Sequence, residues 1–413
     1  MLKHANLPNL KRASASLALC TLLLGCHSKQ DAQTAPAATA ASTPVLSIPL
    51  QRNGHWVVKA QGKDDQSLPV LLDTGATLNA LQEQGPLAAT PITPEAEAAL
   101  LKQGALNSPT GDGTMSIGTL SDPRQFRLGL SPALRIQSWS MPAGTPALLG
   151  DLGRIASADD APFKGIIGSE TMRNLTWRAD YVDGHLTAYS NEAPAHEWQQ
   201  CTFMTLDPHL RTPIISLSLD GESRFFILDT GYDADVAIPA DMFDVLAQAK
   251  RFPNVSTAPG IDATNRVVNS RQGLLAGLTI GQKTLPKLVV SDASQDPRIG
   301  LGTLEKMDRF ELDFRRNRFC FDLPATPRDS AIEPTGSVLL RAGERYEIVS
   351  LAPDGRLARS GAKVGDLITQ VGQTSVAKLD LGHTIELLSN PATDQVSVQR
   401  DNRTLVIKLM KSN

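Results

Sequence analysis

The strongest constraint on this chain is a short motif that occurs twice. Residues 71–77 read LLDTGAT, and residues 226–231 read FILDTG. In each copy an apolar run, typical of a buried strand, ends in an aspartate that is followed by a glycine turn. A single Asp-Thr-Gly carries little information, because Asp and Gly are common turn residues. Two copies in the same context predict a duplicated unit that brings Asp73 and Asp229 face to face.

The regions around the two motifs share an order of expected elements. In residues 44–200 and again in 201–323, alternating strands lead into the motif, and a helix, a glycine-punctuated hairpin, an apolar-Gly element and a closing strand pair follow. The first apolar-Gly element is IIG at 166–168, and the second is interpreted as GLG at 300–302. This order indicates an internal duplication.

Composition favours a mainly-β protein and gives no sign of a cofactor. The chain has 31 Gly and 27 Pro but only 5% aromatic residues, a mixture that suits a turn-rich β protein. The formal net charge is −3, so nothing argues for a nucleic-acid partner. The histidines lack metal-ligand spacing, and no phosphate loop or nucleophile elbow occurs. The sequence therefore predicts no metal and no cofactor.

The N-terminus has the pattern of a targeting segment. Positive residues precede an apolar stretch at 14–24, which is too short for a permanent membrane helix. It ends in LLGC at 23–26, which resembles the bacterial lipobox, where the peptide is cut before a cysteine that becomes diacylated. We therefore expect a lipoprotein signal peptide at 1–25 and lipidation of Cys26. The alternative is an ordinary signal peptide with an incidental cysteine.

Residues 26–43 are expected to be a disordered tether, because they are rich in Ala, Thr, Gln, Ser and Pro and lack periodicity. By the sorting rule of such lipoproteins, His27 after the cysteine favours the outer over the inner membrane. No later stretch is apolar enough to cross a membrane, so lipid would be the only anchor. The expected location is the bacterial cell envelope, facing the periplasm.

Two cysteines remain after the expected processing, Cys201 and Cys320. They open and close the second repeat, in a compartment where disulfides persist. We expect a bridge between them, with two buried thiols as the alternative.

Two aspartates held a few ångströms apart have a chemistry that neither has alone. Because both carboxyls cannot ionise cheaply, Asp73 and Asp229 would share a proton and titrate as one unit. The ionised carboxyl activates a water molecule, and the protonated one donates to a scissile carbonyl. Four flanking residues suit this arrangement, two that can bond the facing turn and two that let backbone amides approach: Thr74, Thr230, Gly75 and Gly231.

With these motifs, residues 44–323 resemble two retropepsin-like aspartic proteases fused in tandem, as in pepsin-type enzymes. The family pattern is two apolar residues, Asp-Thr-Gly-Ala-Ser/Thr, a β-hairpin flap, and an apolar-apolar-Gly element behind the aspartate turn. The second repeat departs from this pattern at Tyr232, where a small residue is usual, and at Gly300, which replaces an apolar residue. The resemblance implies that Asp73 and Asp229 are the catalytic residues.

The resemblance also implies two acid-protease-like β-barrel lobes, at 44–200 and 201–323, each with a flap. The flap candidates are the glycine-punctuated stretches at 111–118 and 260–273. Within them the candidate flap residues are Gly111, Asp112, Gly113 and Gly260. Neither stretch contains the aromatic residue that pepsin-type flaps use, and ordinary surface hairpins are the alternative.

The C-terminal part is expected to be a separate α+β domain. Residues 324–336 have the composition of a linker. Residues 337–413 resemble a bacterial PDZ domain, with SGAKVGDLITQVG at 360–372, a groove helix at 381–389 and a final hairpin at 396–409. A Gly-Leu-Gly-Phe-like carboxylate-binding motif is absent from this sequence.

We therefore expect an envelope aspartic endopeptidase that acts on polypeptide substrates, as a monomer with an internal pseudo-dimer. The PDZ domain would recruit or gate substrates by binding extended or C-terminal peptides through strand addition. The main alternative is a catalytically inactive, lipid-anchored module that binds peptides or proteins in the interlobe cleft and the PDZ groove. Two others are lobes that each pair with a second chain, and Asp-Thr-Gly motifs that are structural Asx turns.

Overall fold

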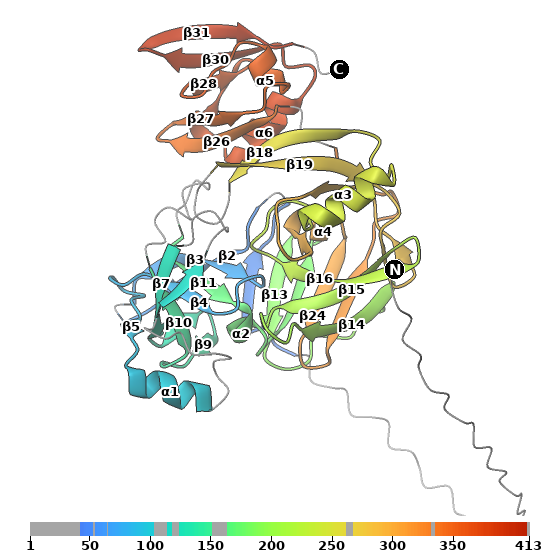
Figure 1. Cartoon of the computed structure of the whole chain (residues 1–413). Helices are drawn as coiled ribbons and strands as arrows, with labels where there is room; N and C mark the ends of the chain where they lie inside the picture. The colour runs from blue at the N-terminus through green and yellow to red at the C-terminus, as the bar shows by residue number, and fades with distance from the viewer. Residues whose placement is uncertain are drawn as a thin grey trace, which may run out of the picture. The chain divides into compact units, whose positions relative to one another are not determined.

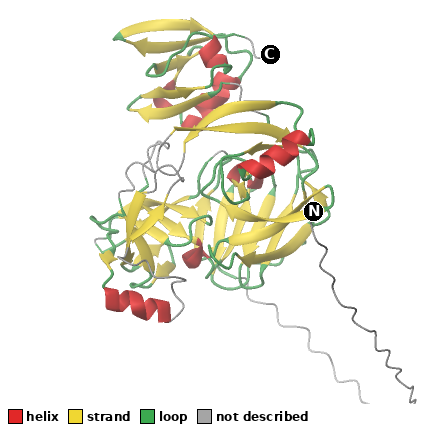
Figure 2. Cartoon of the chain, viewed as in Figure 1, coloured by secondary structure: helices red, strands yellow, loops and turns green. Residues whose placement is uncertain are grey.

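The protein is described by a computed structural model, which confirms the mainly-β fold class (Figures 1 and 2). The described residues are 42–52, 54–63, 65–102, 114–117, 124–150, 163–261, 267–331 and 335–410. The predicted signal peptide at 1–25, the lipidation site Cys26 and nearly all of the tether lie outside them. Within the described ranges, no helix has the length and apolar character needed to cross a membrane.

In its described residues, the N-terminal segment at 44–200 contains short strands and two helices. Its elements in chain order are β1 Leu46–Pro49, β2 Val57–Gln61, β3 Ser67–Asp73, β4 Asn79–Leu81, β5 Thr90–Pro91, α1 Pro94–Lys102, β6 Thr114–Ile117, β7 Arg124–Leu130, β8 Leu134–Ile136, β9 Trp139–Met141, β10 Pro146–Leu149, β11 Gly165–Gly168, α2 Ser169–Met172, β12 Thr176–Asp180 and β13 His185–Tyr189. Most of the strands form one sheet in the order β5-β7-β10-β4-β11-β3-β2-β8-β9.

The middle segment, residues 201–323, repeats this order of elements. Its elements are β14 Gln200–Leu206, β15 Pro213–Leu219, β16 Glu222–Asp229, β17 Val236–Ala237, α3 Ala240–Gln248, β18 Val255–Ile261, β19 Val267–Leu275, β20 Thr279–Ile280, β21 Lys283–Thr284, β22 Leu288–Ser291, β23 Arg298–Gly300, α4 Leu301–Leu304, β24 Arg309–Asp313 and β25 Arg318–Asp322. The β15–β16 hairpin turns at Asp220 and Gly221, which both have positive φ, as a type I′ turn requires.

One sheet and one apolar core run through both segments. Strand β12 pairs antiparallel with β24, with Trp177 opposite Leu312, so the closing strands of the two segments lie side by side. Trp56 is buried and stacks on Phe310 at a centroid distance of 5.7 Å. Because these rings belong to different segments and to one apolar core, we infer that the two segments fold together.

The aspartate strand of each segment has a parallel neighbour in the same register. Asp73 at the end of β3 lies opposite Gly168 of β11, and Asp229 at the end of β16 lies opposite Gly300 of β23. A Cβ at Gly168 would lie 2.5 Å from a backbone oxygen, and one at Gly300 would lie 2.2 Å from another. Only glycine fits, because a loop backbone crosses there.

This register corrects the interpretation of the second apolar-Gly element. The element predicted at 300–302 is wrong, since the residues that match IIG at 166–168 are RIG at 298–300. Residue Leu301 already begins helix α4. Gly300 therefore occupies the glycine position of the pattern, and Arg298 occupies the position of its first apolar residue.

The C-terminal segment contains a sheet in the order β26-β27-β28-β30-β31 and a small apolar core of its own. Its elements are β26 Ser337–Ala342, β27 Arg345–Leu351, α5 Arg356–Arg359, β28 Leu367–Val371, β29 Thr374–Ser375, the 3₁₀ turn η1 Val376–Lys378, α6 Leu381–Ser389, β30 Gln395–Arg400 and β31 Arg403–Lys408. The helix predicted at 381–389 is confirmed, and Asp380 caps it by accepting a hydrogen bond from the His383 amide.

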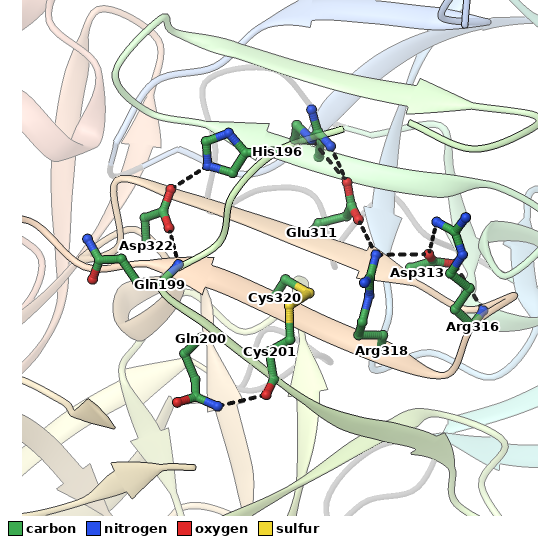
Figure 3. The surroundings of a disulfide bond; sticks show 11 residues. His196, Gln199, Gln200, Cys201, Glu311, Asp313, Arg316, Arg318, Cys320 and Asp322 are labelled. Carbon is green, nitrogen blue, oxygen red and sulfur yellow. Dashed lines mark hydrogen bonds and ion pairs between the residues drawn. A yellow bond between two sulfur atoms is a disulfide. The ribbon is translucent and has the colours of Figure 1, made fainter. Parts of the chain in front are cut away.

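Cys201 and Cys320 form a disulfide between the adjacent strands β14 and β25, as Figure 3 shows. Their Cα atoms lie 4.0 Å apart, and Cys320 is fully buried. Beside the bridge, Asp322 accepts a hydrogen bond from the Gln199 amide and lies 2.7 Å from Nε2 of His196. The bridge joins the first and last strands of the middle segment.

We predict that replacing both cysteines by alanine lowers the free energy of unfolding by about 2–4 kcal/mol, because the bridge closes a chain separation of 119 residues in the unfolded state. Urea unfolding of the oxidised protein, the reduced protein and the double variant measures this. The reduced protein and the variant should agree, and equal stability of all three would contradict the prediction.

Candidate functional site

The two aspartates of the repeated motif lie together where the two segments meet. Each ends a strand whose last residues are buried, and each is followed by the Thr-Gly turn of the motif. The parallel neighbours β11 and β23 hold these strand ends in place. The carboxyls therefore project from two anchored turns, one from each segment.

Crossed hydrogen bonds lock the two turns to each other. The Thr74 amide donates to Oγ1 of Thr230, and the Thr230 amide donates to Oγ1 of Thr74, both at 3.0 Å. Each hydroxyl also donates across the contact, Thr74 to the Leu228 carbonyl at 2.6 Å and Thr230 to the Leu72 carbonyl at 2.8 Å. Both threonines are fully buried. The contact has an approximate two-fold symmetry.

The glycines after the threonines bring each carboxyl against the opposite turn. A Cβ at Gly75 would lie 2.3 Å from Cγ of Asp229, and a Cβ at Gly231 would lie 2.4 Å from Cγ of Asp73. No side chain fits at either glycine without moving the carboxyl that faces it. The carboxyls of Asp73 and Asp229 therefore face each other across the contact.

Asp73 is held by backbone amides of its own turn. Its Oδ1 accepts hydrogen bonds from the amides of Gly75 at 2.8 Å and Ala76 at 3.1 Å. Burial and the nearby charge of Asp229 outweigh these bonds and raise the pKa of Asp73 to about 7. Burial and the neighbouring charge therefore favour the protonated form of Asp73.

Asp229 has different partners. Its Oδ1 accepts a hydrogen bond from the Gly231 amide at 3.0 Å, and its Oδ2 accepts one from Nη1 of Arg298 at 2.7 Å. The next amide, that of Tyr232, donates instead to the Asp229 carbonyl. Asp229 thus has one backbone amide and one guanidinium as donors, whereas Asp73 has two backbone amides.

Arg298 is the functional candidate that the sequence interpretation missed. Arg298 lies on β23, opposite Ile227 of β16. In the same way, Ile166 of β11 lies opposite Leu71 of β3. The signal was present, because RIG at 298–300 aligns with IIG at 166–168 if Gly300 is taken as the last residue of the element.

Tyr232 packs inside the middle segment. Its hydroxyl lies 3.1 Å from Oγ of Ser291 on β22, and burial raises its pKa. Its ring lies 2.6 Å from where a Cβ at Gly300 would be. The Tyr232 ring therefore packs against the backbone at Gly300, where the absence of a side chain leaves room for it.

The predicted flap residues have different outcomes. Gly111, Asp112 and Gly113 lie outside the described residues. Gly260 belongs to β18 and pairs with Val268 of β19, in a hairpin longer than the predicted stretch at 260–273.

Nothing in the composition of the site points to a metal. Over the part of the chain that the structure describes, no group of three or more His, Cys, Asp or Glu side chains is arranged to hold a metal ion. No protein-family model and no curated protein matches the sequence.

We predict that Gly75→Ala lowers the free energy of unfolding by about 1–3 kcal/mol, because its methyl group would overlap the Asp229 carboxyl. Gly54→Ala is the matched control, since the nearest atom to a Cβ there is 3.9 Å away. Urea unfolding of both variants checks this. If Gly75→Ala is as stable as Gly54→Ala, the two turns are not packed as described.

Proposed function

We propose that this protein is a lipid-anchored aspartic endopeptidase of the bacterial cell envelope. The observation that carries the proposal is the pair of facing carboxyls, Asp73 and Asp229, on two equivalent turns locked by crossed threonine hydrogen bonds. The raised pKa of Asp73 supports it, because one proton on such a pair supplies both an acid and a base.

The proposed reaction needs only the pair and a water molecule. The ionised carboxyl, Asp229, takes a proton from water as the water oxygen attacks the peptide carbonyl carbon. Asp73 donates its proton to the carbonyl oxygen, which gives a tetrahedral diol. When the C–N bond breaks, the leaving amine takes the proton from Asp229, and one diol hydroxyl returns a proton to Asp73. The pair ends in its starting protonation state.

We further propose the finer architecture that the resemblance implies. Residues 44–200 and 201–323 would be two acid-protease-like lobes, which the matching registers of β3–β11 and β16–β23 support. Residues 337–413 would be a PDZ domain, supported by the sheet with β26 at its edge and helix α6. Extended or C-terminal peptides would add to that edge and so recruit or gate substrates.

The proposed location follows from the N-terminal residues alone. Cleavage before Cys26 and its lipidation would anchor the chain to the outer membrane by lipid, with residues 26–43 as a tether. The fused lobes would complete the site within one chain, so a monomer is proposed.

A peptide-binding module without hydrolysis is the second candidate. The observation that favours it is the Arg298–Asp229 ion pair, because a carboxylate held by a guanidinium is a weaker base. The packing of Tyr232 inside the middle segment counts against it, since a tyrosine wedged between the lobes would have blocked the site.

We predict that the soluble form, without residues 1–43, cleaves members of a peptide library between acid and neutral pH. Asp73→Asn and Asp229→Asn should each lower the cleavage rate by about 10²–10⁴-fold, because each removes the acid or the base. Mass spectrometry of the products measures the rates.

Asp65→Asn is the matched control, because that side chain is 91% exposed and the substitution removes the same charge. Its cleavage rate should equal that of the unchanged protein. Cleavage that persists in the Asp73→Asn/Asp229→Asn double variant contradicts the assignment of the pair. Peptide binding without cleavage by the folded protein supports the second candidate.

A further inference from the structure

The pair of aspartates is symmetric in its turns but not in its neighbours. On the side of Asp73, strand β11 presents Ile166 at the position beside Leu71. On the side of Asp229, strand β23 presents Arg298 at the equivalent position beside Ile227. One half of an otherwise two-fold arrangement thus carries a positive charge.

The contact of Arg298 with Asp229 is short and shielded from solvent. Nη1 lies 2.7 Å from Oδ2 of Asp229, whose side chain is 6% exposed, while the Arg298 side chain is 28% exposed. The Nε atom of Arg298 is buried and has no hydrogen-bond partner among the described residues. Such a charge-assisted bond favours the ionised form of the carboxyl, and solvent screens it little at this burial.

Other charged and titratable groups nearby have partners or point elsewhere. Tyr232 bonds Ser291, and it interacts electrostatically with Arg298 and with the carboxylates of Asp233 and Asp235. Asp235 is paired with Lys306 at 3.0 Å. Asp233 is exposed to solvent.

Asp73, which faces Asp229 from the other turn, has backbone amides as its hydrogen-bond donors. A proton taken up by the pair is therefore more stable on Asp73 than on Asp229, because protonating Asp229 would give up the ion pair. The pair is polarised before any substrate arrives.

We propose that Arg298 is a positioning residue that assigns the single proton of the pair to Asp73 and keeps Asp229 ionised as the base. This role rests on the proposed function, because base and acid have meaning only for a hydrolytic pair. Arg298 also shifts both protonation steps of the pair to lower pH, since a nearby positive charge opposes the binding of each proton.

The test is a titration of the aspartate carboxyl carbons by ¹³C NMR in the soluble form without residues 1–43, which needs no substrate. The variants are Arg298→Ile, which copies the residue of the first repeat, Arg298→Met, which keeps a long stem if Arg298→Ile does not fold, and Arg298→Lys, which keeps the charge. Arg224→Met is the control, because Arg224 lies on β16 and is 60% exposed.

In the unchanged protein the Asp73 signal should move alone in the first protonation step. In Arg298→Ile or Arg298→Met, the Asp73 and Asp229 signals should move together, because the two carboxyls then share the proton. The midpoint of this first protonation step should rise by about 1–3 pH units. In Arg298→Lys the Asp73 signal should again move without the Asp229 signal. In Arg224→Met both signals should titrate as in the unchanged protein. Where peptides are cleaved, both limbs of the pH–rate profile of Arg298→Ile should shift to higher pH by a similar number of pH units.

The two proposals fail in different ways. If Arg298→Ile and Arg298→Met titrate as the unchanged protein does, the role of Arg298 is overturned, whether or not peptides are cleaved. If the folded protein cleaves no peptide but the titrations change as expected, the proposed function fails and the assignment of the proton by Arg298 stands.

Discussion

The crossed hydrogen bonds between Thr74 and Thr230 are the contact on which the site depends. Both side chains are fully buried, so breaking the contact would leave two amides and two hydroxyls without partners. Because leaving these buried groups unpaired costs free energy, the two turns stay at a fixed distance from each other. The glycines that follow must then be glycines, because each opposite carboxyl occupies the space of a Cβ. The raised pKa of Asp73 follows from the same closeness, since burial and the charge of Asp229 are its main causes.

The part of the site that could be predicted from the sequence is the part formed by the repeated Asp-Thr-Gly motif. The second Asp-Thr-Gly predicted that Asp73 and Asp229 are neighbours. As their chemistry suggests, the two threonines bond each other and each glycine lies against the opposite carboxyl. Arg298 was missed because the residues near a strand do not determine its register with a parallel partner strand. Both RIG at 298–300 and GLG at 300–302 end in a glycine, and only the pairing of β16 with β23 separates them.

In the fold, too, features set by neighbouring residues were predictable, and contacts between residues far apart in the chain were not. Helix α6 was expected at its observed bounds from the resemblance to a PDZ domain, and its Asp380 cap, which the sequence interpretation did not name, involves residues close in sequence. The pairing of β12 with β24, which puts strands of both segments into one sheet, joins residues far apart in the chain. Turn and strand patterns cannot specify such a pairing, because many strands offer an equivalent edge. The mainly-β class was therefore predictable, and the shared sheet was not.

The asymmetry of the pair links the fold to the proposed chemistry. The two repeats supply two equivalent turns, and Arg298 on β23 gives one of the carboxyls, that of Asp229, a guanidinium partner. The most direct test is neutron diffraction from crystals of the deuterium-exchanged protein, grown below the Asp73 pKa of about 7. We expect one deuterium on the Asp73 carboxyl and none on Asp229. A deuterium on Asp229 with Asp73 bare, or none on either carboxyl, would contradict it.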